Sequence, residues 1–95
     1  MVVGCCLLDL LIPATGSLKG KRQVLKSIIG KVRHNFNISI AEVGNHDLWQ
    51  RASLGLSLVG NDRRFVDSAL SKAVEFIQSS RSVTVIKVER EIINF

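Results

Sequence analysis

Basic side chains are concentrated in one stretch of the sequence, from Ser17 to Phe36. This stretch holds six Lys or Arg residues and no Asp or Glu, while the whole chain has 13 basic and 8 acidic residues. Outside it, seven basic and eight acidic residues nearly balance, so the formal net charge of +5 arises from this stretch alone. A local excess of positive charge attracts anionic partners, above all the phosphates of nucleic acids.

The same stretch has the pattern of an amphipathic helix. Ser17 has the residue type of an N-cap, and apolar residues recur at helical spacing. They are Leu18, Leu25, Ile28, Ile29, Val32 and Phe36. On a wheel of about 100° per residue, four cations fall within an arc of about 60° beside this apolar stripe, whereas Lys21 and Lys31 lie elsewhere. The four are Lys19, Arg22, Lys26 and Arg33.

These four cations have no acidic partner one helical turn away, and like charges at that spacing repel by a few tenths of a kcal/mol per pair. Two interpretations stay open: a solvated helix face, or a surface that meets an anionic partner. Binding to nucleic acid would depend strongly on salt and little on sequence. The amides at the helix start would add an anion site. The candidate phosphate contacts are Ser17, Lys19, Lys21, Arg22, Lys26 and Arg33.

A second group of candidate residues lies in the predicted turn GNHDLWQR. Trp49, the only tryptophan, and Arg51 are candidates to stack on an unpaired base. The alternative is that Trp49 folds back to cover the end of a small core. His46 and Asp47 are neighbours in the chain with no nucleophile placed near them, so we do not interpret them as a catalytic pair.

Motifs of catalysis and metal binding are absent from the sequence. It contains no P-loop, no G-x-S-x-G and no His/Cys cluster with metal-ligand spacing. Cys5 and Cys6 are adjacent in a predicted strand, where neighbouring side chains point to opposite faces, so we interpret them as reduced packing residues. We therefore predict a protein that has no enzymatic activity, catalytic residues, metal or cofactor.

The remaining pattern places the basic helix within a βαββαβ order. Strands are predicted over 2–12, 37–43, 51–59 and 83–92, and helices over 18–36 and 66–77. Right-handed crossovers and a central hairpin give an α+β, ferredoxin-like sandwich, a four-stranded antiparallel sheet with both helices on one face. We predict a single domain over residues 1–95. The N-terminal apolar run is interrupted by Asp9 and has no basic leader, which predicts a cytoplasmic protein.

The sheet face without helices is predicted to carry an apolar patch. Alternation along the last strand points Ile86 and Val88 toward the helices and Val83 and Val85 outward. The patch consists of Leu7, Leu11, Val43, Val83 and Val85. Because exposed patches commonly mark interfaces, we predict a homodimer packed sheet to sheet, with a patch tolerated in a monomer as the alternative. The first and third strands carry no aromatic residue, so this face is not an RNA-recognition-motif surface.

Three segments, in this order and spacing, resemble the YlxP-like proteins of bacteria: SLKGKRQVLKS, FNISIAEVG and DLWQRASLGLSLV. The resemblance extends to about Val88 and implies the ferredoxin-like fold. It implies no activity, because the family is uncharacterised; its genes tend to lie beside those for translation initiation and ribosome maturation factors. Gly20 stands where relatives usually have Glu, which removes half of a capping box, so we expect a frayed and more positive first turn.

The sequence as a whole predicts a binding protein that contacts RNA or a ribosomal particle through its basic helix. The alternative is a dimeric module that binds a small ligand or another protein, because ferredoxin-like sandwiches often pair and hold metabolites at their interface. No membrane partner is expected.

Overall fold

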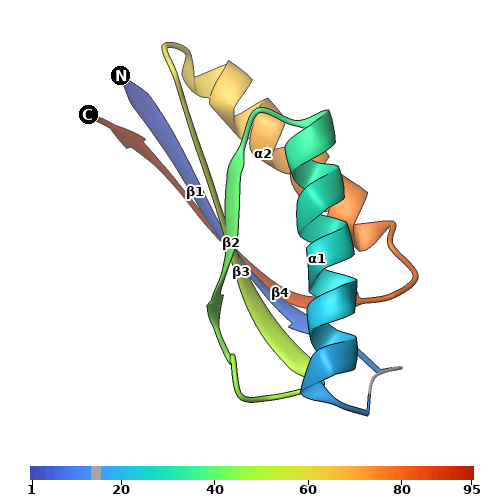
Figure 1. Cartoon of the computed structure of the whole chain (residues 1–95). Coiled ribbons are helices and arrows are strands. Elements are labelled where there is room, and N and C mark those ends of the chain that lie inside the picture. Colours follow the sequence, from blue (N-terminus) through green and yellow to red (C-terminus); the bar gives the residue numbers. More distant parts are fainter. Residues whose placement is uncertain (14–15) are drawn as a thin grey trace.

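In the part of the chain that the structure describes, four strands and two helices follow one another in the order β1, α1, β2, β3, α2 and β4 (Figure 1). They are β1 (Val2–Leu11), α1 (Leu18–Asn35), β2 (Ser39–Gly44), β3 (Arg51–Gly60), α2 (Arg63–Gln78) and β4 (Thr84–Asn94). The computed structural model describes residues 1–13 and 16–95; residues 14 and 15, in the predicted break between strand and helix, lie outside the described residues. One antiparallel sheet has the strand order β2-β3-β1-β4, and both helices cover one of its faces. The predicted ferredoxin-like fold is confirmed.

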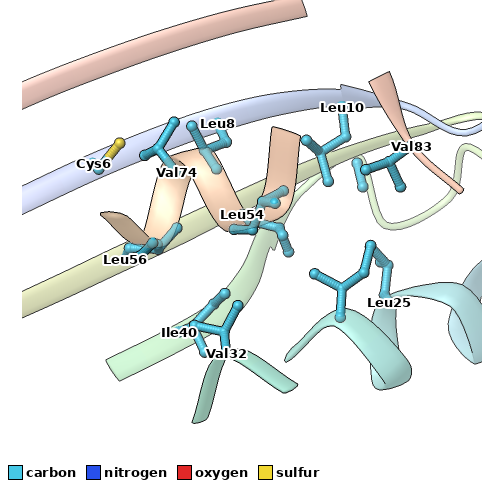
Figure 2. Packing of buried hydrophobic residues seen from close by; sticks show 14 of the residues in the cluster. Cys6, Leu8, Leu10, Leu25, Val32, Ile40, Leu54, Leu56, Val74 and Val83 are labelled. Carbon is cyan, nitrogen blue, oxygen red and sulfur yellow. The ribbon is translucent and has the colours of Figure 1, made fainter. Parts of the chain in front are cut away.

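The core lies between the sheet and the helices (Figure 2). Leu8 of β1 pairs with Leu54 of β3, and both side chains are fully buried on the helix side. Leu25 of α1 and Val74 of α2 belong to the same buried cluster. Leucine alternates with serine and glycine along β3, so this strand buries one face and leaves the other without a helix over it, as predicted.

Each helix begins at a side-chain cap. Ser17 Oγ accepts a 3.0 Å hydrogen bond from the Gly20 amide, which confirms the predicted N-cap of α1. Asp62 Oδ1 accepts a 3.1 Å hydrogen bond from the Arg64 amide at the start of α2. These bonds satisfy amides that have no carbonyl partner within the helix. Helix α1 is thus regular from Leu18 onward, and fraying of its first turn stays a prediction.

Helix α2 approaches β1 closely at Gly4. A Cβ atom at this position would lie 2.6 Å from Val66 Cγ1 and 2.8 Å from Leu70 Cδ1, both on α2. These separations are shorter than van der Waals contact between carbons, about 3.5–4.0 Å. The absence of a side chain at Gly4 therefore sets how near α2 lies to the sheet.

Strand β4 changes its register against β1 at one position. Asp9 pairs with Lys87, whereas the next residue, Leu10, pairs with Val85. Ile86 is therefore an extra residue on β4, which forms a β-bulge. Because side chains alternate with a period of two, one extra residue reverses which residues face the helices on its far side.

The bulge makes the predicted outward placement of Val83 and Val85 wrong. Val83 is 5% exposed within the core, and Val85 packs against that core, so neither lies on the uncovered face. Val88, beyond the bulge, does oppose the core residue Leu8, as predicted, although it stays 41% exposed. Strict alternation along β4 takes no account of the bulge at Ile86. It therefore predicts the wrong face of the sheet for Val83 and Val85, which precede the bulge.

Candidate nucleic-acid interface

Lys21 is the one residue of the predicted phosphate-contacting set that is buried. It lies three residues after Leu18 and four before Leu25, on the apolar stripe of α1, and is only 1% exposed. Its ammonium group lies 2.9 Å from Glu42 Oε2 on β2. A buried, ion-paired ammonium cannot reach a phosphate outside the protein, so the prediction that Lys21 contacts nucleic acid is wrong.

The Lys21 side chain instead holds the turn between β2 and β3. Lys21 Nζ donates hydrogen bonds of 2.6 Å to the carbonyl oxygens of Asn45 and Leu48, and the His46 carbonyl lies at 3.5 Å. Glu42 Oε2 is buried beside this ammonium, so the two groups form an ion pair next to the turn. Asn45 has a positive φ of 59°, a left-handed conformation that asparagine tolerates well. Lys21 thus fixes the hairpin tip to the first turns of α1.

The position of Lys21 was detectable in the sequence. A lysine on an apolar helical stripe is buried only if it is paired, and Glu42 is the one acidic residue of the predicted second strand. The helical wheel recorded only that Lys21 lies away from the four clustered cations. A charged residue on the apolar stripe of a helix indicates a buried ion pair, and this is the signal that the prediction did not use.

Trp49 lies against the segment that leads into α1. A Cβ atom at Gly16 would be 3.5 Å from Trp49 Cζ3, which is ordinary van der Waals contact. The Trp49 side chain nonetheless remains 46% exposed. The indole is therefore neither fully folded back onto the core nor free of the protein, and part of its surface is available to a partner.

Four of the exposed cations of α1 share one side of the helix and form a surface that we call the basic face: Lys19, Arg22, Lys26 and Arg33. In residues 1–13 and 16–95, the side chains of Lys19, Arg22 and Lys26 make no ion pair or hydrogen bond. Arg33 Nη2 donates a 3.0 Å hydrogen bond to the Ile40 carbonyl of β2, which places this face on the β2 side of the helix. At 1.5 Å per residue, the face extends about 21 Å along α1.

The predicted site residues fall into two groups. Ser17, Lys19, Arg22 and Trp49 gather at the start of α1, with Lys26 and Arg33 continuing along the helix. Arg51 pairs with Leu11, and both lie on the strand faces opposite the buried Ala52, so the sheet separates Arg51 from α1. Arg51 does not belong to the same surface as the basic face.

The sheet face without helices, which we call the open face, retains three of its five predicted apolar residues. Leu7, Leu11 and Val43 lie on it, and Val43 is 54% exposed. The alternating register adds four exposed apolar residues that the sequence analysis missed. They are Met1, Val59, Ile93 and Phe95. A hollow of about 490 Å³ on this face includes Leu7, Val43 and Gly55 in its lining.

Several polar side chains of the open face bind one another. Ser53 Oγ donates a 2.9 Å hydrogen bond to Asp9 Oδ1 and accepts one of 2.9 Å from Asn45 Nδ2. On β4, Lys87 and Glu89 form an exposed ion pair of 2.9 Å. Asp9 is thus held by a hydroxyl within the sheet and has no partner arrangement suited to proton transfer.

The described residues offer no further group suited to catalysis or metal binding. Within 1–13 and 16–95, no group of three His, Cys, Asp or Glu side chains could hold a metal ion. His46 and Asp47 are exposed in the turn. No helix in this part of the chain is both long and apolar enough to cross a membrane.

Comparison with known proteins identifies relatives without a known activity. A family described as "Protein of unknown function (DUF503)" matches residues 3–90. The uncharacterized protein YlxP of Bacillus subtilis (strain 168) is 40% identical over 78 residues, 82% of this chain and 85% of that protein. A solved structure described as "Structure of the REP associates tyrosine transposase bound to a REP hairpin" matches 98% of this chain with 14% identity and a TM-score of 0.46. The chain spans 56% of the length of that structure.

Proposed function

The chain belongs to the DUF503 family of proteins of unknown function, and we propose that this member is a non-enzymatic, cytoplasmic protein that binds RNA or a ribosomal particle through the basic face. The predicted resemblance to YlxP-like proteins is confirmed. Since family membership implies no activity, the proposal depends on the surface of α1.

The observation that carries the proposal is that several exposed cations lie together along one side of α1 without a carboxylate partner among the described residues. Lys21, Lys87 and Arg90 each have a carboxylate partner at 2.9 Å. Lys19, Arg22 and Lys26 have none among the described residues, although they share one side of one helix. Uncompensated like charges raise the free energy of the free protein slightly, and phosphates would remove that repulsion.

Trp49 extends this surface with a group that recognises unpaired bases. It lies beside Gly16, which is next to the helix cap and three residues before Lys19, the first cation of the basic face, and its side chain is 46% exposed. An aromatic ring beside a row of cations is the arrangement with which proteins bind single-stranded nucleic acid, by stacking and phosphate contacts together. The neighbourhood of the family's genes makes ribosomal RNA the first candidate.

Co-sedimentation with ribosomal subunits from the host tests the proposal. At about 50 mM salt the protein is expected to pellet saturably, and at about 300 mM salt much less, because few phosphate contacts survive screening. The variant Arg22→Glu, Lys26→Glu is expected to lose pelleting. The matched control, Arg64→Glu, Lys72→Glu, makes the same change of charge at exposed residues of α2 and should pellet like the parent protein.

Either of two results would contradict the proposal. Absence of pelleting at the lower salt concentration would show that the basic face is a solvated helix surface without a ribosomal partner. Equal loss in both double variants would show that only the net charge of the protein matters. Circular dichroism of each variant establishes that the fold is intact.

A second proposal concerns the open face, which we infer to be the interface of a homodimer. Six of the exposed large apolar side chains lie on it: Met1, Leu7, Val43, Val59, Ile93 and Phe95. Lys87 and Glu91 lie on β4 on either side of Glu89. A two-fold axis across the strands near Leu7 would bring Lys87 of one copy beside Glu91 of the other, which favours a second copy as the occupant.

The two cysteines provide a test of this interface. Cys5 is half-buried on the open face, whereas Cys6 is 4% exposed in the core. Burial raises the pKa of the Cys6 thiol, with Arg90 acting in the opposite direction, so its reactive thiolate is disfavoured. Mass spectrometry after alkylation is expected to show Cys5 labelled first in dilute protein, and labelled more slowly at about 100 µM, where dimers would form.

Light scattering at the same concentrations gives the independent readout. Leu7→Glu is expected to yield a monomer whose Cys5 labelling no longer depends on protein concentration. A monodisperse parent monomer at about 100 µM would contradict the homodimer. In that case, the alternative of a ligand-binding or protein-binding open face would be tested instead.

A further inference from the structure

A second hollow, distinct from the basic face and the open face, lies between α1 and the loop that follows α2. Its volume is about 310 Å³, at the lower end of the range of about 300–1,000 Å³ that is usual for ligand pockets. Helix α1 lines it with residues spaced three, four and seven apart, which share one side of the helix. The lining residues that matter most are Val24, Ser27, Lys31, Phe76, Arg81 and Ser82.

The floor of the hollow is apolar. Val24 and Phe76 are half-buried and pack against the core while lining the cavity. The Phe76 ring is held by Phe36 in an edge-to-face contact, with centroids 5.6 Å apart and planes at 70°. This contact fixes an aromatic surface against which the apolar part of a ligand can pack.

The rim of the hollow is basic and rich in hydroxyls. Lys31 and Arg81 come from separate elements, both are exposed, and within the described part of the chain neither forms an ion pair. No carboxylate lines the hollow. The Ser79 hydroxyl donates to the Phe76 carbonyl at 2.6 Å, whereas those of Ser27 and Ser82 have no hydrogen-bond partner among the described residues.

A structural role explains only part of this arrangement. A cation just beyond the C terminus of α2 interacts favourably with the helix dipole, which accounts for Arg81. It does not account for Lys31, which lies inside α1, or for the cavity between the two cations. Two uncompensated cations above an apolar floor are complementary to an anion that has an apolar body.

We propose that this hollow binds a small organic anion. Its apolar body packs on Val24 and Phe76, and its phosphate or carboxylate group lies between Lys31 and Arg81. The Ser82 hydroxyl is placed to donate to the same group. Lys31 projects from the side of α1 that faces the α2 loop, away from the basic face on the β2 side, so this site is independent of the proposed RNA surface.

Nuclear magnetic resonance titration of the full chain tests the site with named probes. 1-Naphthyl phosphate and 1-naphthoate distinguish the two anionic groups, while inorganic phosphate and 1-naphthol each supply one half of the ligand. At least one of the two naphthyl anions is expected to shift the amide signals of Ser27, Arg81 and Ser82. Inorganic phosphate and 1-naphthol should bind about tenfold more weakly, because each lacks one kind of contact.

The variant Lys31→Glu, Arg81→Glu is expected to weaken binding of the naphthyl anion at least about tenfold, since both charge-assisted contacts become repulsive. The control Arg64→Glu, Lys72→Glu should bind like the parent protein. Unchanged affinity in the Lys31 and Arg81 variant, or shifts confined to another surface, would overturn the proposal. So would displacement of the naphthyl anion by RNA at the same resonances, which would assign the hollow to nucleic acid.

Discussion

Replacing Lys21 with methionine is expected to lower the free energy of unfolding by about 3 kcal/mol, because it removes one member of a buried ion pair. Methionine replaces the apolar part of the lysine side chain up to Cε, but it lacks the ammonium group and so has no donor for the carbonyls of Asn45 and Leu48. Glu42 retains 21% exposure of its side chain, but Oε2, the oxygen that faces Lys21, is buried, so water does not reach it where the ammonium is lost. The two carbonyls of the turn have no comparable replacement inside the protein.

Urea unfolding measures this effect, and the fluorescence of Trp49 reports where it arises. Trp49 is the only tryptophan and lies beside the turn that Lys21 holds, so its emission should shift to the red in the folded variant. Glu42→Leu and the double variant complete a cycle. The double variant should lose about 1–2 kcal/mol less than the sum of the single changes.

A Lys21→Met protein whose urea unfolding midpoint equals that of the parent protein would contradict the expectation. Additive losses around the cycle would show that Lys21 stabilises the turn through the carbonyls alone. In both cases the basic face keeps its four exposed cations. If a folded Lys21→Met protein lost RNA binding, the cause would therefore be a changed conformation of the hairpin tip and not a change in the charge of the basic face.

Gly4→Val is expected to lower the free energy of unfolding by about 3 kcal/mol, at the upper end of the usual effect of overpacking a core. The first added atom would already lie 2.6 Å from Val66 and 2.8 Å from Leu70. Leu70 can rotate to make room, but the short, branched Val66 side chain moves only if α2 moves. Thermal and urea unfolding measure the loss.

Gly30→Ala is the matched control for the glycine substitution. Gly30 is exposed within α1, and no atom lies within 4 Å of an added Cβ. This variant should gain up to about 1 kcal/mol, since alanine has less conformational entropy to lose and a higher helix propensity. Equal stability of Gly4→Val and the parent protein would show that α2 shifts freely on the sheet, against the packing described above.

The fold was predictable because its local signals agree with one another. The alternation of β3, the apolar stripe of α1 and the cap at Ser17 each point to the element observed. Chirality of crossovers then leaves few topologies for such an order. Consistency of this kind between local and global preferences is typical of sequences with one native structure.

What could not be predicted arises from contacts between distant segments. The bulge at Ile86 follows from the pairing of β4 with β1, and no local pattern announces one extra residue. The apolar stripe of α1 indicates that Lys21 is buried, but no local pattern indicates that its ammonium binds the carbonyls of Asn45 and Leu48, more than twenty residues away. The basic face itself was placed correctly, since helical periodicity alone determines it, and its function stays a proposal.

The central position of β1 bears on how the chain folds during its own synthesis. This first strand pairs with β3 and with β4, and the Val2 and Asn94 pairing joins residues 92 positions apart. At about 5–20 residues per second, translation delivers β4 several seconds or more after β1. Until then one edge of an apolar strand remains unpaired, so β1 of the nascent chain depends on its hydrogen bonds with β3 and on the packing of α2 for early protection. Sequence separations of this size also slow folding compared with helical proteins of similar length.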